Sequence, residues 1–206
     1  MSRNSSSARW KARQARDPFV KRAQAEGWRS RAVFKLSELQ GRERLIKPGS
    51  VVVDLGAAPG AWSQFAAGVV GDQGRVLAVD LLPMTALAGV EILQGDFREE
   101  TMVKTLLARL ADRPVDLVLS DMAPNMTGTR VVDQPRTMEL AELAADFASQ
   151  VLRPGGNLVV KLFQGEGFKE YVEATRARFA SVRMRKPAAS RSGNRETYLV
   201  ARNFRL

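Results

Sequence analysis

The sequence predicts one α/β domain with a mostly parallel, seven-stranded sheet and helices on both faces. Two patterns lead to this fold class. Short β-branched runs alternate along the chain with segments whose apolar residues recur at helical spacing, and turns rich in glycine separate them. Right-handed crossovers between parallel strands then place helices on both faces of the sheet. A chain of 206 residues that is 45% apolar can fill one core of this kind.

The first half of the chain is expected to contribute three strands. The run Val51-Val52-Val53-Asp54-Leu55 is mostly β-branched, as in a buried strand, and a turn at Lys47-Pro48-Gly49 precedes it. The expected strands of this half cover residues 51–55, 75–80 and 90–94. The expected helices cover residues 30–39, 62–70 and 99–110.

The second half is expected to complete the sheet. Residues 122–136 are rich in Pro, Gly, Asn and Thr, so they are expected to form a loop. The expected helices cover residues 137–152 and 167–179, and the expected strands cover residues 115–121, 157–163, 182–185 and 197–201. Ligands of parallel sheets bind beyond the carboxyl ends of the strands. That edge is therefore expected to hold the candidate site residues Gly56, Asp80, Asp96, Asp121 and Lys161.

Composition excludes several chemistries. The chain has no cysteine and no histidine, so disulfides, thiol nucleophiles, His–Cys zinc sites and Ser–His–Asp triads are excluded. A general base must then be Lys, Asp, Glu, Tyr or the backbone. No metal ligand set is expected.

Positive charge gathers at the two ends of the chain. The net charge is +10, with +7 in residues 1–31, +6 in residues 183–206 and −3 between them. Such basic ends favour a polyanionic partner. Residues 1–28 are expected to form a basic, partly flexible arm, whose Trp10, Phe19 and Trp28 stack on unpaired bases or, for the last two, pack on the domain. No segment has the length of a membrane span or the apolar core of a secretory signal, so we expect a cytoplasmic protein without a membrane partner.

The turn after the first strand has the pattern of a cofactor loop. Gly56 and Gly60 permit left-handed backbone conformations and close approach to a ligand. Asp80 ends the next strand, which is the placement of a carboxylate that binds a ribose diol. A tight turn without any ligand is the alternative reading of the same residues.

The spacing within this loop argues against a dinucleotide. A dinucleotide fingerprint requires glycine where Ala58 stands, and Pro59 has no N–H for a pyrophosphate. A nucleoside without phosphates fits better, and S-adenosylmethionine is the favoured cofactor, with Asp96 as the acid for its adenine. A nicotinamide-dependent oxidoreductase is the rival enzyme hypothesis.

Five runs of residues resemble the FtsJ-type ribose methyltransferases. They are Gly-Ala-Ala-Pro-Gly-Ala-Trp-Ser-Gln at 56–64 and the runs at 29–36, 120–125, 158–163 and 190–198. The resemblance covers nearly the whole chain from about Arg29, with Ala61 standing where the family more often has Gly. It implies a Rossmann-like S-adenosylmethionine-dependent methyltransferase domain over residues 29–206. It also implies methyl transfer to the 2′-hydroxyl of a uridine ribose in large-subunit, 23S-type ribosomal RNA.

The same resemblance implies roles for individual residues. The catalytic set would be Lys35, Asp121, Lys161 and Glu196, with Lys161 as the proton acceptor. The methyl donor would be bound by Gly60, Trp62, Asp80, Asp96 and Asp121. The sequence itself adds that Lys161 interrupts an apolar run, where a buried ammonium is costly unless it is paired. A neutral Lys161 would take the hydroxyl proton, whereas a charged one would stabilise the developing alkoxide while Asp121 orients the hydroxyl.

Ribosomal RNA, within the large subunit or its precursor, is the expected partner, and the protein is expected to be a monomer. Two alternatives stay open. One is 2′-O-ribose methylation of transfer RNA or another RNA. The other is a non-catalytic RNA-binding factor in ribosome assembly, against which the complete set of two lysines and two acids argues.

Overall fold

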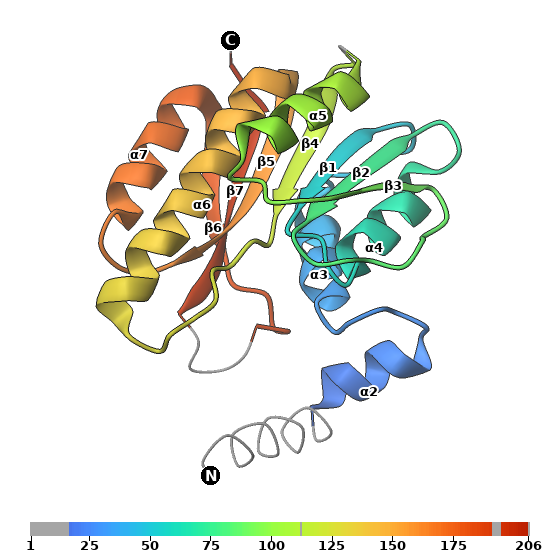
Figure 1. Ribbon diagram of the computed structural model, residues 1–206, viewed down its shortest axis with the longest axis horizontal. Coiled ribbons are helices and arrows are strands. Elements are labelled where there is room, and N and C mark those ends of the chain that lie inside the picture. The colour runs from blue at the N-terminus through green and yellow to red at the C-terminus, as the bar shows by residue number, and fades with distance from the viewer. Residues whose placement is uncertain (1–16, 112, 191–194, 206) are drawn as a thin grey trace.

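Seven strands form one sheet in the computed structural model, which describes residues 17–111, 113–190 and 195–205 (Figure 1). The strands are β1 (Val51–Leu55), β2 (Arg75–Asp80), β3 (Val90–Gln94), β4 (Val115–Ser120), β5 (Leu152–Phe163), β6 (Phe179–Arg185) and β7 (Glu196–Phe204). The helices are α2 (Pro18–Ala25), α3 (Val33–Glu43), α4 (Ala61–Val70), α5 (Glu100–Leu110), α6 (Arg130–Val151) and α7 (Phe168–Arg178). The predicted α/β class is confirmed.

The strand order across the sheet is β3-β2-β1-β4-β5-β7-β6. The first five strands in this order pair in parallel, and β7 lies antiparallel between β5 and β6, as expected of a closing pair. The chain adds β2 and β3 on one side of β1 and then places β4 on the other side. At such a reversal the loops leaving neighbouring strands diverge, which is where ligands of these sheets bind.

Helices cover both faces of the sheet (Figure 1). Side chains of α5, α6 and α7, such as Leu106, Phe147 and Tyr171, pack on one face. Those of α3 and α4, such as Leu36 and Trp62, pack on the other. The central strands are buried on both faces, which is why their sequences are continuous apolar runs rather than alternating ones.

The predicted loop over residues 122–136 is wrong in its second half, because α6 begins at Arg130. Asp133 explains this early start. Its carboxylate accepts hydrogen bonds from Thr127 N (2.8 Å), Thr127 Oγ1 (2.9 Å) and Gly128 N (2.9 Å), which closes the preceding loop onto the first turns of the helix. Pro135 lies inside α6, in its second turn. β5 also begins earlier than predicted, at Leu152, and the other boundaries differ by at most four residues.

A buried carboxylate anchors α3 to the edge of the sheet. The side chain of Glu43, at the end of α3, is 1% exposed. It contacts the guanidinium groups of Arg185 (2.5 Å), Arg183 (3.3 Å) and Arg202 (3.6 Å), which come from β6 and β7. Three positive charges around one carboxylate hold the helix that carries Lys35 across this edge.

The segment before α3 packs on the domain. Asp17 caps α2 by accepting a hydrogen bond from Phe19 N at 3.0 Å. The ring of Phe19 lies 5.7 Å from that of Phe34, and the ring of Trp28 lies 6.2 Å from that of Phe65. Phe19 and Trp28 therefore pack on the domain, which is one of the two arrangements expected for them from the sequence. Residues 1–16, which include Trp10 and most of the basic arm, lie outside the described residues. Within the described part, no helix combines the length and apolar character that a membrane span requires.

Candidate active site

Lys161 and Asp121 meet at the carboxyl edge of the sheet. Lys161 lies near the end of β5 and is 8% exposed, and Asp121 directly follows β4. Lys161 Nζ lies 3.2 Å from Asp121 Oδ1 and donates a hydrogen bond to the Asp121 carbonyl oxygen at 2.5 Å. The ammonium that interrupts this apolar strand is thus paired, as burial of a charge requires.

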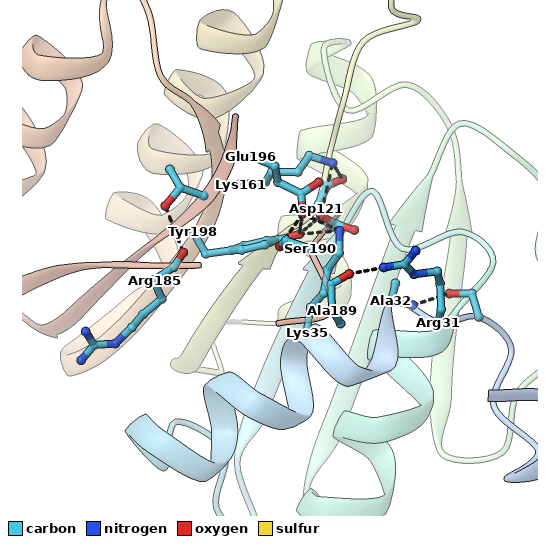
Figure 2. Close-up of polar contacts among 12 residues, drawn as sticks. Arg31, Ala32, Lys35, Asp121, Lys161, Arg185, Ala189, Ser190, Glu196 and Tyr198 are labelled. Atoms are coloured by element: carbon cyan, nitrogen blue, oxygen red, sulfur yellow. Dashed lines mark hydrogen bonds and ion pairs between the residues drawn. The ribbon is translucent and has the colours of Figure 1, made fainter. Parts of the chain in front are cut away.

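Lys35 and Glu196 form a second pair beside the first. Lys35 extends from α3, and its Nζ lies 2.7 Å from Glu196 Oε1 at the start of β7. Glu196 Oε1 also accepts a hydrogen bond from Ser190 Oγ at 3.0 Å. Residues distant in sequence are thereby brought together, and all four members of the predicted catalytic set lie in one cluster (Figure 2).

The hydroxyl group of Tyr198 joins the two pairs (Figure 2). It donates to Asp121 Oδ1 at 2.8 Å, accepts from Lys35 Nζ at 3.1 Å and lies 3.4 Å from Glu196 Oε1. Its ring packs on Trp62, with 5.6 Å between the ring centroids. Sequence reasoning assigned no role to this tyrosine. The available signal was its spacing of two from Glu196, which on a strand places both side chains on one face.

Charges within the cluster shift the pKa values of its acids. Burial opposes ionisation of Asp121, but the ammonium groups of Lys161 and Lys35 and the Tyr198 hydroxyl outweigh it, so the Asp121 pKa lies below its ordinary value. Burial, followed by the nearby Asp121 and Glu196, raises the pKa of Tyr198 well above its usual value. Asp121 is therefore an anion and Tyr198 a neutral phenol at physiological pH.

The turn between β1 and α4 is built around two glycines. Gly56 has φ +75°, and a Cβ there would lie 2.7–2.8 Å from atoms of Met122, including its backbone. Gly60 has φ +105° and forms the N-cap of α4. Only glycine suits both positions, because left-handed backbone is strained for other residues and Gly56 has no space for a side chain.

Two of the three carboxylates predicted for the cofactor, Asp80 and Asp96, lie at or just beyond the ends of neighbouring strands. Asp80 accepts hydrogen bonds from Ala58 N and Leu82 N, both at 2.8 Å, and so holds the glycine turn against β2. Asp96 follows β3 and pairs with Arg98, whose side-chain and backbone hydrogen bonds lower the Asp96 pKa. Gly95 N donates to the Asp80 carbonyl oxygen at 2.9 Å, which keeps these two segments adjacent.

Trp62, also predicted to bind the cofactor, is only 3% exposed. Its indole Nε1 donates to the Ala32 carbonyl oxygen at 2.8 Å, and its ring packs against Tyr198. The side chain thus ties α4 to α3 and β7. Any contact of Trp62 with a ligand falls to its backbone at the start of α4.

Sequence reasoning missed a further carboxylate, Asp54 in β1. Its side chain is fully buried, and its Oδ2 accepts a hydrogen bond from Ser63 Oγ at 2.6 Å. Its Oδ1 has no hydrogen-bond partner among the described residues. Burial, together with Asp121 and Asp80 nearby, raises the Asp54 pKa to about 7. A carboxylate inside an apolar run is the same signal that pointed to Lys161.

These features define a doubly wound α/β protein with a row of carboxylates at its switch point and a cluster of amines and acids beside it. The sequence model of the FtsJ-like methyltransferases matches residues 28–204. A protein of Stenotrophomonas maltophilia named ribosomal RNA large subunit methyltransferase E is 59% identical over 98% of this chain and 97% of its own length. Its counterpart of the same name in Alkalilimnicola ehrlichii is 57% identical over 99% and 98%.

A solved structure is also similar. The crystal structure of a Plasmodium falciparum protein described as a ribosomal RNA methyltransferase superimposes with a TM-score of 0.76 at 27% identity, over 86% of this chain and 98% of that one. The chain belongs to the FtsJ-like methyltransferase family. The resemblance drawn from the sequence motifs is therefore confirmed.

Proposed function

We propose that this protein transfers a methyl group from S-adenosylmethionine to the 2′-hydroxyl of a uridine ribose in large-subunit, 23S-type ribosomal RNA. One observation carries the proposal. Lys35, Asp121 and Glu196 lie within hydrogen-bond distance of the Tyr198 hydroxyl, and Lys161 pairs with Asp121 beside the glycine turn. The names of the relatives at 57% and 59% identity support ribosomal RNA of the large subunit as the substrate.

The residues around the glycine turn fit this cofactor. Asp54, Asp80, Asp96 and Asp121 lie at or near the carboxyl ends of four adjacent strands, β1, β2, β3 and β4. A row of carboxylates suits the positive charge of a sulfonium and the hydroxyl groups of a ribose. The unpartnered Oδ1 of Asp54 is a buried acceptor that a cationic or hydrogen-bonding ligand would satisfy. Leu81 and Leu82, both exposed beyond Asp80, offer apolar surface for an adenine.

The proposed mechanism needs a hydroxyl held close to the methyl carbon, about 3 Å away and in line with the breaking bond. Bound S-adenosylmethionine supplies an electrophilic methyl group on a sulfonium. Lys161, once it has released its ammonium proton to solvent, holds the 2′-oxygen and accepts its proton as the new bond forms. Asp121 orients the Lys161 amine and, through it, the 2′-hydroxyl, because Lys161 Nζ contacts both the carboxylate and the carbonyl oxygen of Asp121. Lys35 and Glu196 hold the Tyr198 hydroxyl in place, and their opposite charges balance each other.

The proposed RNA contacts are electrostatic. A hollow of about 410 Å³ adjoins Glu196 and is lined by Gln164, Met184, Arg185, Lys186, Arg195 and Thr197. Its cationic side chains suit the phosphates that flank a target ribose. We propose that the basic arm, residues 1–28, adds to this grip, that Asp80 and Asp96 contact the cofactor, and that a monomer acts in the cytoplasm on the large subunit or its precursor.

Substitution of Lys161 tests the catalytic assignment. Lys161→Ala should lower single-turnover methyl transfer by at least 10³-fold, roughly the contribution of a positioned acid or base, while S-adenosylmethionine affinity by calorimetry stays within about twofold. Lys169→Ala, which removes an exposed lysine from α7, is the matched control. Lys161→Arg keeps the charge but cannot accept the proton. Methyl transfer by Lys161→Arg would indicate that this side chain stabilises the developing alkoxide by its charge and does not accept the proton. A fully active Lys161→Ala would refute the site.

The substrate is tested in cells. Ribose methylation is mapped in ribosomal and transfer RNA from cells with and without the gene. Loss of one 2′-O-methyluridine from large-subunit RNA is the expected result. Loss confined to transfer RNA, or no loss together with defective subunit assembly, would favour one of the two alternatives instead.

A further inference from the structure

Arg29 lies between α2 and α3, and its guanidinium reaches two separate loops. Nη1 donates to the carbonyl oxygens of Pro59 (3.1 Å) and Thr85 (2.9 Å), and Nη2 donates to that of Ala86 (2.7 Å). Pro59 belongs to the glycine turn before α4, whereas Thr85 and Ala86 belong to the segment between β2 and β3. One side chain therefore joins two segments that are far apart in sequence and that flank the proposed cofactor site.

The path of Arg29 is fixed by its surroundings. Its backbone N–H donates to Gln64 Oε1 at 3.1 Å, and Gln64 Nε2 donates to the Gly27 carbonyl oxygen at 3.0 Å. A Cβ on Gly60 would lie only 3.0 Å from Arg29 Nη1. The absence of a side chain at Gly60 thus leaves room for the guanidinium beside the turn.

The segment between β2 and β3 depends on such a tie. Residues 81–89 form no helix or strand, and Leu81 and Leu82 are 58% and 61% exposed, so apolar packing does little to hold this segment. Among the hydrogen bonds of the described residues, those from Arg29 are the ones that reach residues 83–86 from elsewhere in the chain. Without them, these residues would be free to move away from the glycine turn.

We propose that Arg29 is a positioning residue that clamps the two loops lining the cofactor site, and that it is not a contact for RNA. The inference rests on the proposed function, because it takes the ligand between these loops to be S-adenosylmethionine. The chemistry of the side chain supports it. A guanidinium is a planar fork with five N–H donors, which suits simultaneous bonding to several carbonyl oxygens. Three hydrogen bonds direct the guanidinium of Arg29 to the protein rather than to an RNA backbone.

The clamp predicts a separation between cofactor binding and RNA binding. Arg29→Ala should weaken the binding of S-adenosylmethionine and S-adenosylhomocysteine at least tenfold in calorimetry. The KM for S-adenosylmethionine should rise, and kcat at saturating cofactor should stay within about threefold. Arg29→Lys should not restore affinity, because a compact ammonium cannot span both loops. The affinity for a ribosomal RNA hairpin, measured without cofactor by fluorescence anisotropy, should match that of Arg42→Ala, which removes an exposed arginine from α3.

A second measurement does not depend on ligands. Hydrogen–deuterium exchange of the free protein should increase in residues 81–89 of Arg29→Ala and stay unchanged in β4 and β5. Unchanged exchange there, or unchanged cofactor affinity with RNA affinity below that of Arg42→Ala, would overturn the clamp. Failure of the wild-type protein to bind either S-adenosyl compound would instead refute the proposed function, and the inference with it.

Discussion

Replacement of Asp54 by Asn should stabilise the protein at alkaline pH and have little effect in acid. The folded protein holds the Asp54 proton up to a pKa of about 7, whereas the unfolded chain releases it near the ordinary value of 3.8. Between these values the folded state binds more protons than the unfolded state. Stability therefore falls as the pH rises from about 4 to about 7, and the full cost of ionised Asp54 is present above pH 7.

The size of the effect follows from the same difference. At about 1.4 kcal/mol for each pKa unit, ionised Asp54 costs the folded state on the order of 4 kcal/mol at pH 8. This is an upper bound, because relaxation and water entry reduce the penalty of a buried charge. An Asn side chain carries no charge and keeps an oxygen for the hydrogen bond from Ser63 Oγ.

Urea unfolding of the ligand-free protein at pH 5 and pH 8 measures this difference. Wild type should lose stability between the two values relative to Asp54→Asn, and Asp72→Asn, which alters an exposed carboxylate, should follow wild type. Parallel stability profiles for wild type and Asp54→Asn over this range would refute the raised pKa. The variant should also bind S-adenosylmethionine more weakly, since it removes a negative charge from the row of carboxylates proposed to face the sulfonium.

Two further predictions concern stability. Gly56→Ala should cost about 2–4 kcal/mol in urea unfolding, because it adds left-handed strain to an overlap with Met122. Gly27→Ala, at nearly the same φ but in open space, should cost only about 1 kcal/mol, and equal costs would contradict the packing argument. Glu43→Gln should cost about 2 kcal/mol, below the 3–5 kcal/mol of a fully buried pair because its arginines keep part of their hydration. Glu100→Gln, which breaks an exposed pair, should cost about 0.5 kcal/mol or less, and a similar loss in both variants would contradict the anchor.

Much of the fold was predictable because its central strands are buried on both faces. Runs such as Val51–Leu55 and Arg75–Asp80 are apolar at most positions, so their limits are clear in the sequence. The start of α6 was not predictable from composition, because it depends on Asp133 reaching back to Thr127 and Gly128. A stretch rich in loop-forming residues can be helical when one side chain satisfies the free N–H groups ahead of it.

The position of the candidate site at the carboxyl edge of the sheet and most of its residues could be predicted from the sequence. The hydrogen bonds that join these residues could not. Parallel strands bring their carboxyl ends together, so Asp80 and Asp121 were expected at one edge. The part of Tyr198 depends on strand register, because it pairs directly with Lys161 across β5 and β7. That register is a long-range property of the sheet. Asp54 could have been predicted, because it interrupts an apolar run in the same way as Lys161 does.

Charge balance explains why the cluster can be buried at the end of the sheet. Two lysines face two carboxylates, and the hydroxyl that joins them is held neutral by its raised pKa. Because Tyr198 donates to Asp121 while accepting from Lys35, it links the two ion pairs without adding charge. A substrate hydroxyl that enters beside Lys161 therefore meets fixed dipoles and charges rather than mobile water. Such preorganised groups stabilise a developing charge without the cost of reorientation during the reaction.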